Sequence, residues 1–174
     1  MSARLRWIAV GTIVAVVLIV AAGCTREEDR VPEMLLTPAP RECPHSLVRA
    51  GDSANPLDIG EGLHGHLPER LPRGFGLMGV WAEGGPQLGS AMWTDRACRE
   101  IAITVWQFHN LPRAGPRLGD WVVNESGPHD CGNAVLGDGR CLRYYAVLDG
   151  RRVEVFMMGV ERSDGDPIVL SIRT

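Results

Sequence analysis

The stretch CLRYYAVLDGRRVEVFMMGV, residues 141–160, decides the fold. Its two apolar runs, 141–148 and 152–160, lie on either side of Asp149-Gly150. Asp-Gly between two such runs is the composition of a two-residue turn in which both central residues take a positive φ. The stretch therefore predicts an antiparallel β-hairpin, and the alternation in its second run indicates a strand that is covered on both faces.

Turn signals divide the rest of the chain into further short strands. Glu83-Gly84-Gly85-Pro86 separates two of them, and the segment SDGDP at 163–167 precedes the last one. The strands expected outside the hairpin are 75–82, 88–94, 99–108, 121–124 and 168–172. Short strands at this turn spacing favour a mainly β protein of the β-rich α+β class, with a single antiparallel sheet or meander of about six or seven strands.

Residues 99–108 show a clear two-residue alternation. One face of the expected strand is aliphatic, with Ile101, Ile103 and Val105. Trp106 lies on the other face, which is more polar, so we expect its ring to be partly exposed.

Six aromatic residues lie on expected strands: Trp81, Trp93, Trp106, Trp121, Tyr144 and Tyr145. Such side chains either fill the core of a small sheet protein or form a platform for a glycan, a peptide or a lipid. Both interpretations stay open at this point. Trp106, Trp93 and Tyr145 are the candidates for a ligand face.

At most one short helix is expected, near residues 58–67. Gly60, Gly62 and Gly65 weaken it, and Pro68 ends it. We find no other convincing apolar period of 3.6 residues.

The first 24 residues have the layout of a secretory signal. Arg4 and Arg6 precede an apolar run over 7–20, and small residues follow it. Cys24, directly after Ala-Ala-Gly, resembles the lipobox cysteine of bacterial lipoproteins, to which a diacylglyceryl group is attached before cleavage. The resemblance implies a mature chain that is held by lipid at the outer face of the cytoplasmic membrane, or at the outer membrane in a diderm organism.

A retained membrane helix and plain secretion are the alternatives to lipidation. A spanning helix needs about 20 apolar residues, and the apolar run is at the lower limit of that length. With cleavage before Cys24, we expect a signal peptide over 1–23, a charged and Pro-rich flexible tether over 24–42, and one β-rich extracytoplasmic domain over 43–174. Within the tether, residues 34–36 are apolar, unlike their neighbours, and we expect them to contact the domain or the membrane surface.

Four cysteines follow Cys24, and an even number in an exported chain indicates disulfides. A zinc site is the alternative, but the chain has no Cys-x-x-Cys pair. The preferred pairing is Cys43–Cys98, which joins the N-terminal segment to the sheet, and Cys131–Cys141, which closes a short Gly-rich loop.

The composition excludes several function classes. All 18 basic residues are arginine, there are 21 acidic residues, and the net charge is −3. Without lysine the chain has no lysine Schiff base, no phosphate-binding lysine of a P-loop and no Ser-Lys nucleophile pair. A net negative chain also repels phosphate backbones, so we expect no nucleic-acid partner.

No constellation of catalytic or metal-binding residues stands out. Gly51-Asp52-Ser53 resembles the Gly-Asp-Ser blocks of two serine hydrolase families, but the partner motifs of those families are missing and the composition is that of a turn. His64 and His66 are weak candidates for metal ligands. Zinc needs three or four ligands, and no other residue nearby is a clear further ligand. We expect no catalytic residue, no metal and no cofactor, and we favour a protein that is not an enzyme.

Leu71-Pro72-Arg73-Gly74-Phe75 opens an expected strand. A Gly-rich turn and the residues Trp-Thr-Asp follow it. This order is similar to the curved-sheet domains of bacterial envelope lipoproteins and lipoprotein carriers, in which a Leu-Pro-x-Gly-Phe-like entry opens the sheet. The likeness covers residues 67–173 and has no catalytic residue to transfer.

These expectations favour a lipid-anchored cell-envelope lipoprotein with a non-enzymatic binding or accessory role. Cys24 would attach it to the membrane, and its partner would be an envelope protein, a glycan or a lipid. Two alternatives stay open. One is an envelope hydrolase that uses Ser53 or the His64/His66 region, and the other is a sensor or inhibitor of a neighbouring envelope protein.

Overall fold

The computed structural model describes residues 31–40, 43, 62–63, 65–81, 86–112, 115–126, 131 and 140–172. These residues belong to one compact unit, Val31–Thr174. The predicted signal peptide, Cys24, Ser53 and His64 lie outside the described residues. Among the described residues, no helix has the length and apolar character needed to cross a membrane.

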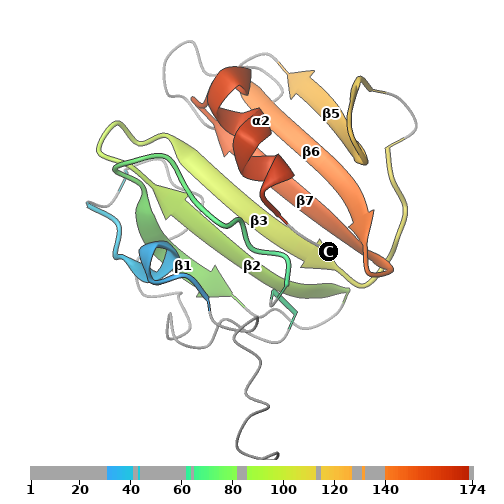
Figure 1. Cartoon of the computed structure of the whole chain (residues 1–174), viewed down its shortest axis with the longest axis horizontal. Helices are drawn as coiled ribbons and strands as arrows, with labels where there is room; N and C mark the ends of the chain where they lie inside the picture. The colour runs from blue at the N-terminus through green and yellow to red at the C-terminus, as the bar shows by residue number, and fades with distance from the viewer. Residues whose placement is uncertain are drawn as a thin grey trace, which may run out of the picture. The chain divides into compact units, whose positions relative to one another are not determined.

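Seven strands form one antiparallel sheet (Figure 1). In chain order they are β1 (Gly76–Trp81), β2 (Gln87–Thr94), β3 (Glu100–Trp106), β4 (Arg117–Leu118), β5 (Trp121–Ser126), β6 (Cys141–Leu148) and β7 (Arg151–Met158). Across the sheet the order is β1-β2-β3-β7-β6-β5-β4. Consecutive strands therefore pair within β1–β3 and within β4–β7, and the pairing of β3 with β7 joins the two groups. The predicted mainly β fold with a single antiparallel sheet is confirmed.

The hairpin that decides the fold forms as predicted. Asp149 and Gly150 connect β6 to β7 with φ values of 50° and 74°, the two positive angles that a type I′ turn requires. Leu148 pairs with Arg151 directly beside this turn. Because side chains alternate along a strand, this register determines which residues of β6 and β7 share a face.

One face of the sheet holds the hydrophobic core, and we call it the helix face because α2 (Arg162–Leu170) packs on it (Figure 1). Leu63, Leu71 and Phe75, which precede β1, join the same core. The core residues on strands are Leu77, Val80, Ala91, Trp93, Ile101, Ile103, Val105, Trp121, Val123, Leu142, Tyr144, Ala146, Leu148, Val153, Val155 and Met157. Burying one large aliphatic side chain stabilises a fold by about 1.5–3 kcal/mol, so this face contributes most of the hydrophobic stabilisation.

The structure contradicts two predictions about secondary structure. The strand expected over 168–172 is wrong, because Arg162–Leu170 is a helix, and the turn expected over 163–167 lies inside that helix. The short helix expected near 58–67 is absent from 62–63 and 65–67, which form turns and coil. The single short α-helix of the described residues therefore lies near the C-terminal end of the chain.

Packing on the sheet explains why α2 is helical. Small and apolar residues recur at the helical spacing i, i+3, i+4 and i+7: Gly165, Ile168, Val169 and Ile172. The hydroxyl of Tyr144 on β6 donates a 2.7 Å hydrogen bond to Asp166. Burial and this hydrogen bond raise the pKa of Tyr144, so the hydroxyl keeps its proton and connects the helix to the sheet.

The folded unit starts earlier than predicted. The short 3₁₀ helix η2 (Glu33–Leu36) buries Leu35 completely in the core. The indole Nε1 of Trp93 donates a 2.8 Å hydrogen bond to the carbonyl oxygen of Leu35. Residues 31–40 therefore pack as part of the domain, and the tether predicted over 24–42 is too long.

Both predicted disulfides are present. Cys43–Cys98 has a Cα–Cα distance of 5.5 Å, and Cys131–Cys141 has one of 5.7 Å. Cys141 is the first residue of β6, and Cys98 lies in the turn between β2 and β3. Each bond therefore joins the sheet to a segment outside its strands.

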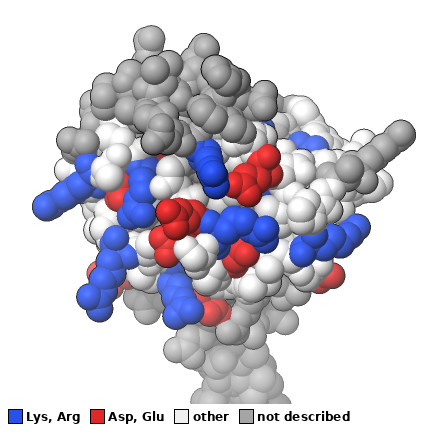
Figure 2. All heavy atoms as spheres, turned by 90° about the horizontal axis from the view of Figure 1, so that it is seen from above, with Lys and Arg blue, Asp and Glu red and all other residues white. Residues whose placement is uncertain are grey.

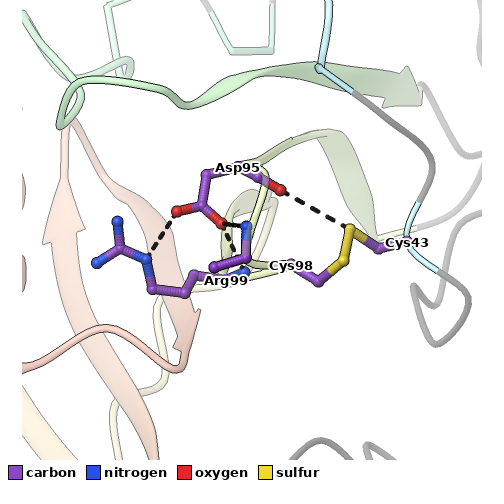
Figure 3. Close-up of a disulfide and its surroundings, with 5 residues drawn as sticks. Cys43, Asp95, Cys98 and Arg99 are labelled. Atoms are coloured by element: carbon purple, nitrogen blue, oxygen red, sulfur yellow. Dashed lines mark hydrogen bonds and ion pairs between the residues drawn. A yellow bond between two sulfur atoms is a disulfide. The ribbon is translucent and has the colours of Figure 1, made fainter.

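A buried carboxylate shapes the turn that holds Cys98 (Figure 3). Asp95 accepts hydrogen bonds from the backbone N–H of Ala97 at 2.9 Å and of Arg99 at 3.0 Å. Its second oxygen accepts a bond from the Arg99 Nε at 2.8 Å. With its backbone held on both sides, Cys98 takes a φ of 59°, which is uncommon for a residue with a side chain.

Candidate ligand-binding face

The face of the sheet opposite the helix face, which we call the second face, carries the candidate site. Three rows of side chains cross β6, β7 and β3 on it: Val147–Arg152–Trp106, Tyr145–Glu154–Thr104 and Arg143–Phe156–Ala102. Side chains opposite each other in a sheet are close enough to interact. The register therefore gathers two arginines, one glutamate and several aromatic rings.

Arg152 lies among three aromatic rings, near the start of β7 and beside the Asp149-Gly150 turn. Its guanidinium carbon is 4.4 Å from the ring centroid of Phe108 and 5.3 Å from that of Trp106. The centroid of Tyr145 is 5.8 Å away. The rings of Trp106 and Phe108 also stack, with 5.4 Å between their centroids. We call these four residues the arginine–aromatic cluster. Contacts between a cation and a ring contribute about 0.5–2 kcal/mol each, so the cluster orders Arg152.

Glu154 connects Arg152 to a second arginine. Its carboxylate accepts hydrogen bonds from Arg152 at 3.5 Å and from Arg143 at 3.4 Å. The Arg143 guanidinium also lies 5.0 Å from the ring centroid of Phe156. The Arg143 side chain is 38% exposed, so solvent screens its ion pair and the pair contributes no more than about 1 kcal/mol.

The arginine–aromatic cluster has more hydrogen-bond donors than acceptors. The buried indole Nε1 of Trp106 and the buried Nε of Arg152 have no hydrogen-bond partner among the described residues. The two bonds that Arg152 does make, to Glu154 at 3.5 Å and to the Asn110 carbonyl at 3.4 Å, are long. An unpaired buried donor costs about 1–3 kcal/mol, so two of them in one small cluster require an explanation.

The structure separates the three aromatic residues that the sequence offered for a ligand face. Trp106 is partly exposed on the second face, and Tyr145 lies on the same face but is buried. Trp93 pairs with Ile101 in the register and is fully buried in the core of the helix face. Trp93 therefore does not belong to a ligand face, because side-chain alternation points it to the side that α2 and η2 cover.

Four residues of the site were missed in the sequence: Arg143, Arg152, Glu154 and Phe108. The alternation of β7 about the Asp-Gly turn places Arg152 and Glu154 on the same face, and that signal was available. The contact between Arg152 and Phe108 could not be predicted from the sequence, because it depends on β3 lying beside β7.

His66, one of the two weak metal candidates, is buried. It is 2% exposed, and its Nδ1 has no hydrogen-bond partner among the described residues. Burial lowers the pKa of His66, Asp149 nearby opposes this shift, and Arg151 adds to it. In the part of the chain that the structure describes, no group of three or more His, Cys, Asp or Glu residues could hold a metal ion. His64 and Ser53 lie outside that part, so the hypotheses about them stay hypotheses.

A cavity of about 260 Å³ lies between α2 and the segment that precedes β1. It is lined by Arg70, Leu71, Pro72, Ser163, Asp164, Pro167 and Ile168. This lining offers the hydroxyl of Ser163 and the carboxylate of Asp164, and the structure has no hydrogen bond between these two described side chains. In the view of Figure 2, arginine side chains lie across the described surface with acidic side chains between them.

Comparison with known proteins gives no relationship: no protein-family model, no curated protein and no solved structure matches this chain. The geometry of the second face, rather than kinship, therefore indicates what the chain can bind.

Proposed function

We propose that the protein is a lipid-anchored lipoprotein of the bacterial cell envelope with a non-enzymatic binding or accessory role, and that the second face contacts its partner. The arginine–aromatic cluster is the observation that carries the binding role. Tryptophan, tyrosine and arginine are the side chains that most often dominate the binding energy of interfaces. Because the surrounding rings already order Arg152, its side chain loses little conformational entropy when a partner binds.

The anchor is supported by the position of Cys24 after Ala-Ala-Gly. Two disulfides fit an oxidising compartment outside the cytoplasm. The hydrolase is the less favoured alternative, because His66 is buried, and a buried imidazole is a poor general base for a substrate that arrives from solvent. A sensor or inhibitor would use the second face in the same way as a binding protein, so the two differ only in what the partner does.

Metabolic labelling with an alkyne analogue of palmitate tests the anchor. Full-length protein from a bacterial host should carry the label and sediment with the membrane fraction. The variant Cys24→Ala should carry no label and should keep the mass of the precursor. An unlabelled parent protein, or a Cys24→Ala form that matures and sediments like the parent, would contradict the anchor.

Photocrosslinking from two exposed positions tests the binding face. Val147 is 38% exposed in the row of Arg152 and Trp106, and Leu170 is 56% exposed on α2. The photoreactive residue benzoylphenylalanine is placed at either position in the full chain, and intact cells are irradiated. We expect a discrete crosslinked product from position 147 at roughly fivefold the yield from position 170, and a reduced yield when Trp106→Ala is added. Equal yields, or no product from position 147, would remove the support for this face.

A further inference from the structure

The hydrogen-bond balance of the second face points to the chemistry of its partner. Arginine carries five N–H donors and no acceptor. Arg152 donates to Asn110 and Glu154 only, among described groups, and its Nε–H has no partner there. Arg143 donates to the same Glu154 carboxylate. One carboxylate thus serves two guanidinium groups, while the Trp106 indole N–H next to them also has no acceptor among the described residues.

These ion pairs leave room for another carboxylate. The distances from Glu154 to Arg143 and Arg152 are 3.4 Å and 3.5 Å, whereas a tight pair between charged nitrogen and oxygen measures about 2.7–2.9 Å. Arg143 is also the most exposed of the three. A carboxylate that arrives from solvent can therefore form a bidentate pair with a guanidinium group without breaking a short bond.

Positive groups outnumber negative ones in the three rows that contain the two arginines. Arg143 and Arg152 share one glutamate there, Glu154, whereas the chain as a whole carries a net charge of −3 and the other glutamate of this face, Glu100, is buried in the next row beside Met158. Charge complementarity therefore favours an acidic partner at this face. Because salt screens charges beyond about 8–10 Å, the net negative charge of the chain does little to oppose such a contact.

The neighbours of the arginines favour a polypeptide over a glycan. A sugar ring stacks on an open aromatic face, but Arg152 covers the Phe108 ring at 4.4 Å and Trp106 stacks on Phe108 at 5.4 Å. Val147, beside Arg152, and Phe156, under Arg143, are exposed in part and offer contacts to apolar side chains. A protein segment can supply both carboxylates and apolar groups.

We infer that the second face binds an acidic polypeptide segment of another protein. Carboxylates of this segment pair with Arg143 and Arg152, one oxygen accepts from the Trp106 indole when the cluster adjusts, and apolar side chains contact Val147. This inference rests on the proposed binding function and names the chemical class of its partner.

Three anionic compounds, two polymers and one small phosphate, distinguish the classes of ligand when they are added to the full-length lipoprotein in detergent. Fluorescent poly-L-glutamate represents a polypeptide carboxylate, poly-D-galacturonate represents a glycan carboxylate, and glycerol phosphate serves as a competitor with the chemistry of a lipid headgroup. Fluorescence anisotropy measures binding at low and at raised salt. We expect poly-L-glutamate to bind about tenfold more tightly than poly-D-galacturonate, and to resist competition by glycerol phosphate.

Variants connect that binding to the second face. Arg152→Gln and Arg143→Gln should each weaken the binding of poly-L-glutamate by about five- to tenfold. Arg73→Gln, an exposed arginine outside the second face, should leave it unchanged. Trp106→Phe keeps an aromatic ring and removes the N–H donor, and it should weaken binding by about threefold. Circular dichroism and thermal unfolding of each variant confirm that it is folded.

The outcomes separate this inference from the proposed function. Tighter binding of poly-D-galacturonate, or release by glycerol phosphate, assigns the face to another ligand class and overturns the inference. Equal binding of poly-L-glutamate by the parent and by Arg152→Gln overturns it too. If crosslinking at position 147 succeeds in either case, the binding function stands with a different partner, whereas failed crosslinking removes the binding function itself.

Discussion

Among single residues, His66 has a direct effect on how stability depends on pH. Its ordinary pKa is 6.5, and burial lowers that pKa in the folded protein. Above pH 6.5 the imidazole is neutral in both the folded and the unfolded state. Below this value the unfolded chain binds a proton that the folded protein binds less readily. The contribution of His66 to the free energy of unfolding is therefore complete above pH 6.5 and is lost as the pH falls toward the lowered pKa.

We predict that urea unfolding will show a lower midpoint at about pH 5 than at about pH 7.5, and that His66→Gln will reduce this difference. His109→Gln is the matched control, because His109 is exposed and should leave the pH dependence as it is in the parent protein. A His66→Gln variant that keeps the full pH dependence would show that other groups cause it.

At the scale of elements, α2 depends on a glycine where it meets the sheet. A Cβ at position 165 would lie 2.9 Å from the Met157 sulfur and 3.0 Å from the Tyr144 hydroxyl oxygen. Alanine has a helix propensity about 1 kcal/mol better than glycine, but overpacking a tight contact costs about 1–3 kcal/mol. The same displacement disturbs the hydrogen bond from Tyr144 to Asp166.

We predict that Gly165→Ala will lower the free energy of unfolding in urea by about 1–2 kcal/mol. Ser163→Ala is the control within the same helix, because Ser163 is exposed, and it should change stability by less than about 0.5 kcal/mol. A more stable Gly165→Ala would mean that α2 moves easily on the sheet and that helix propensity dominates.

Local signals predicted the elements that local interactions form. The Asp-Gly turn and the alternation over 99–108 are such signals, and the strands they predict are β6, β7 and β3. The helix Arg162–Leu170 was missed because its Ser-Asp-Gly-Asp-Pro composition favours a turn, and packing of Gly165 on the sheet overrides that preference. β4 was missed because two residues are too short to show alternation.

In the candidate site, too, local patterns predicted some features, and the features that depend on long-range strand pairing could not be predicted. Alternation placed Trp106 on the partly exposed face of its strand. The surroundings of Arg152 depend on the pairing of β3 with β7, strands that are far apart in the sequence, and no local pattern encodes that pairing. Trp93 shows the converse: it was a candidate for a ligand face, and the register of β2 against β3 places it in the core, which was the other interpretation of the aromatic residues.

At the scale of the whole molecule, the two disulfides stabilise the fold to different extents. Cys43–Cys98 links residues separated by 55 positions, and Cys131–Cys141 links residues separated by 10. A disulfide lowers the entropy of the unfolded chain, and the effect grows with the logarithm of the loop length. Loop entropy alone gives about 4 kcal/mol for the longer loop and about 3 kcal/mol for the shorter one.

We therefore predict that Cys43→Ser/Cys98→Ser will lose more stability than Cys131→Ser/Cys141→Ser, by roughly 1–2 kcal/mol in urea unfolding without reductant. Both cysteines of a pair are replaced together, so that neither variant carries a free thiol that could form a wrong disulfide. The reduced parent protein, alkylated after unfolding, is the control that lacks both bonds and should be the least stable form. If Cys131→Ser/Cys141→Ser instead loses more stability, packing and not loop entropy decides the order of the two variants. Cys141 is fully buried against Met158, and a serine at this position would place a hydroxyl in that contact.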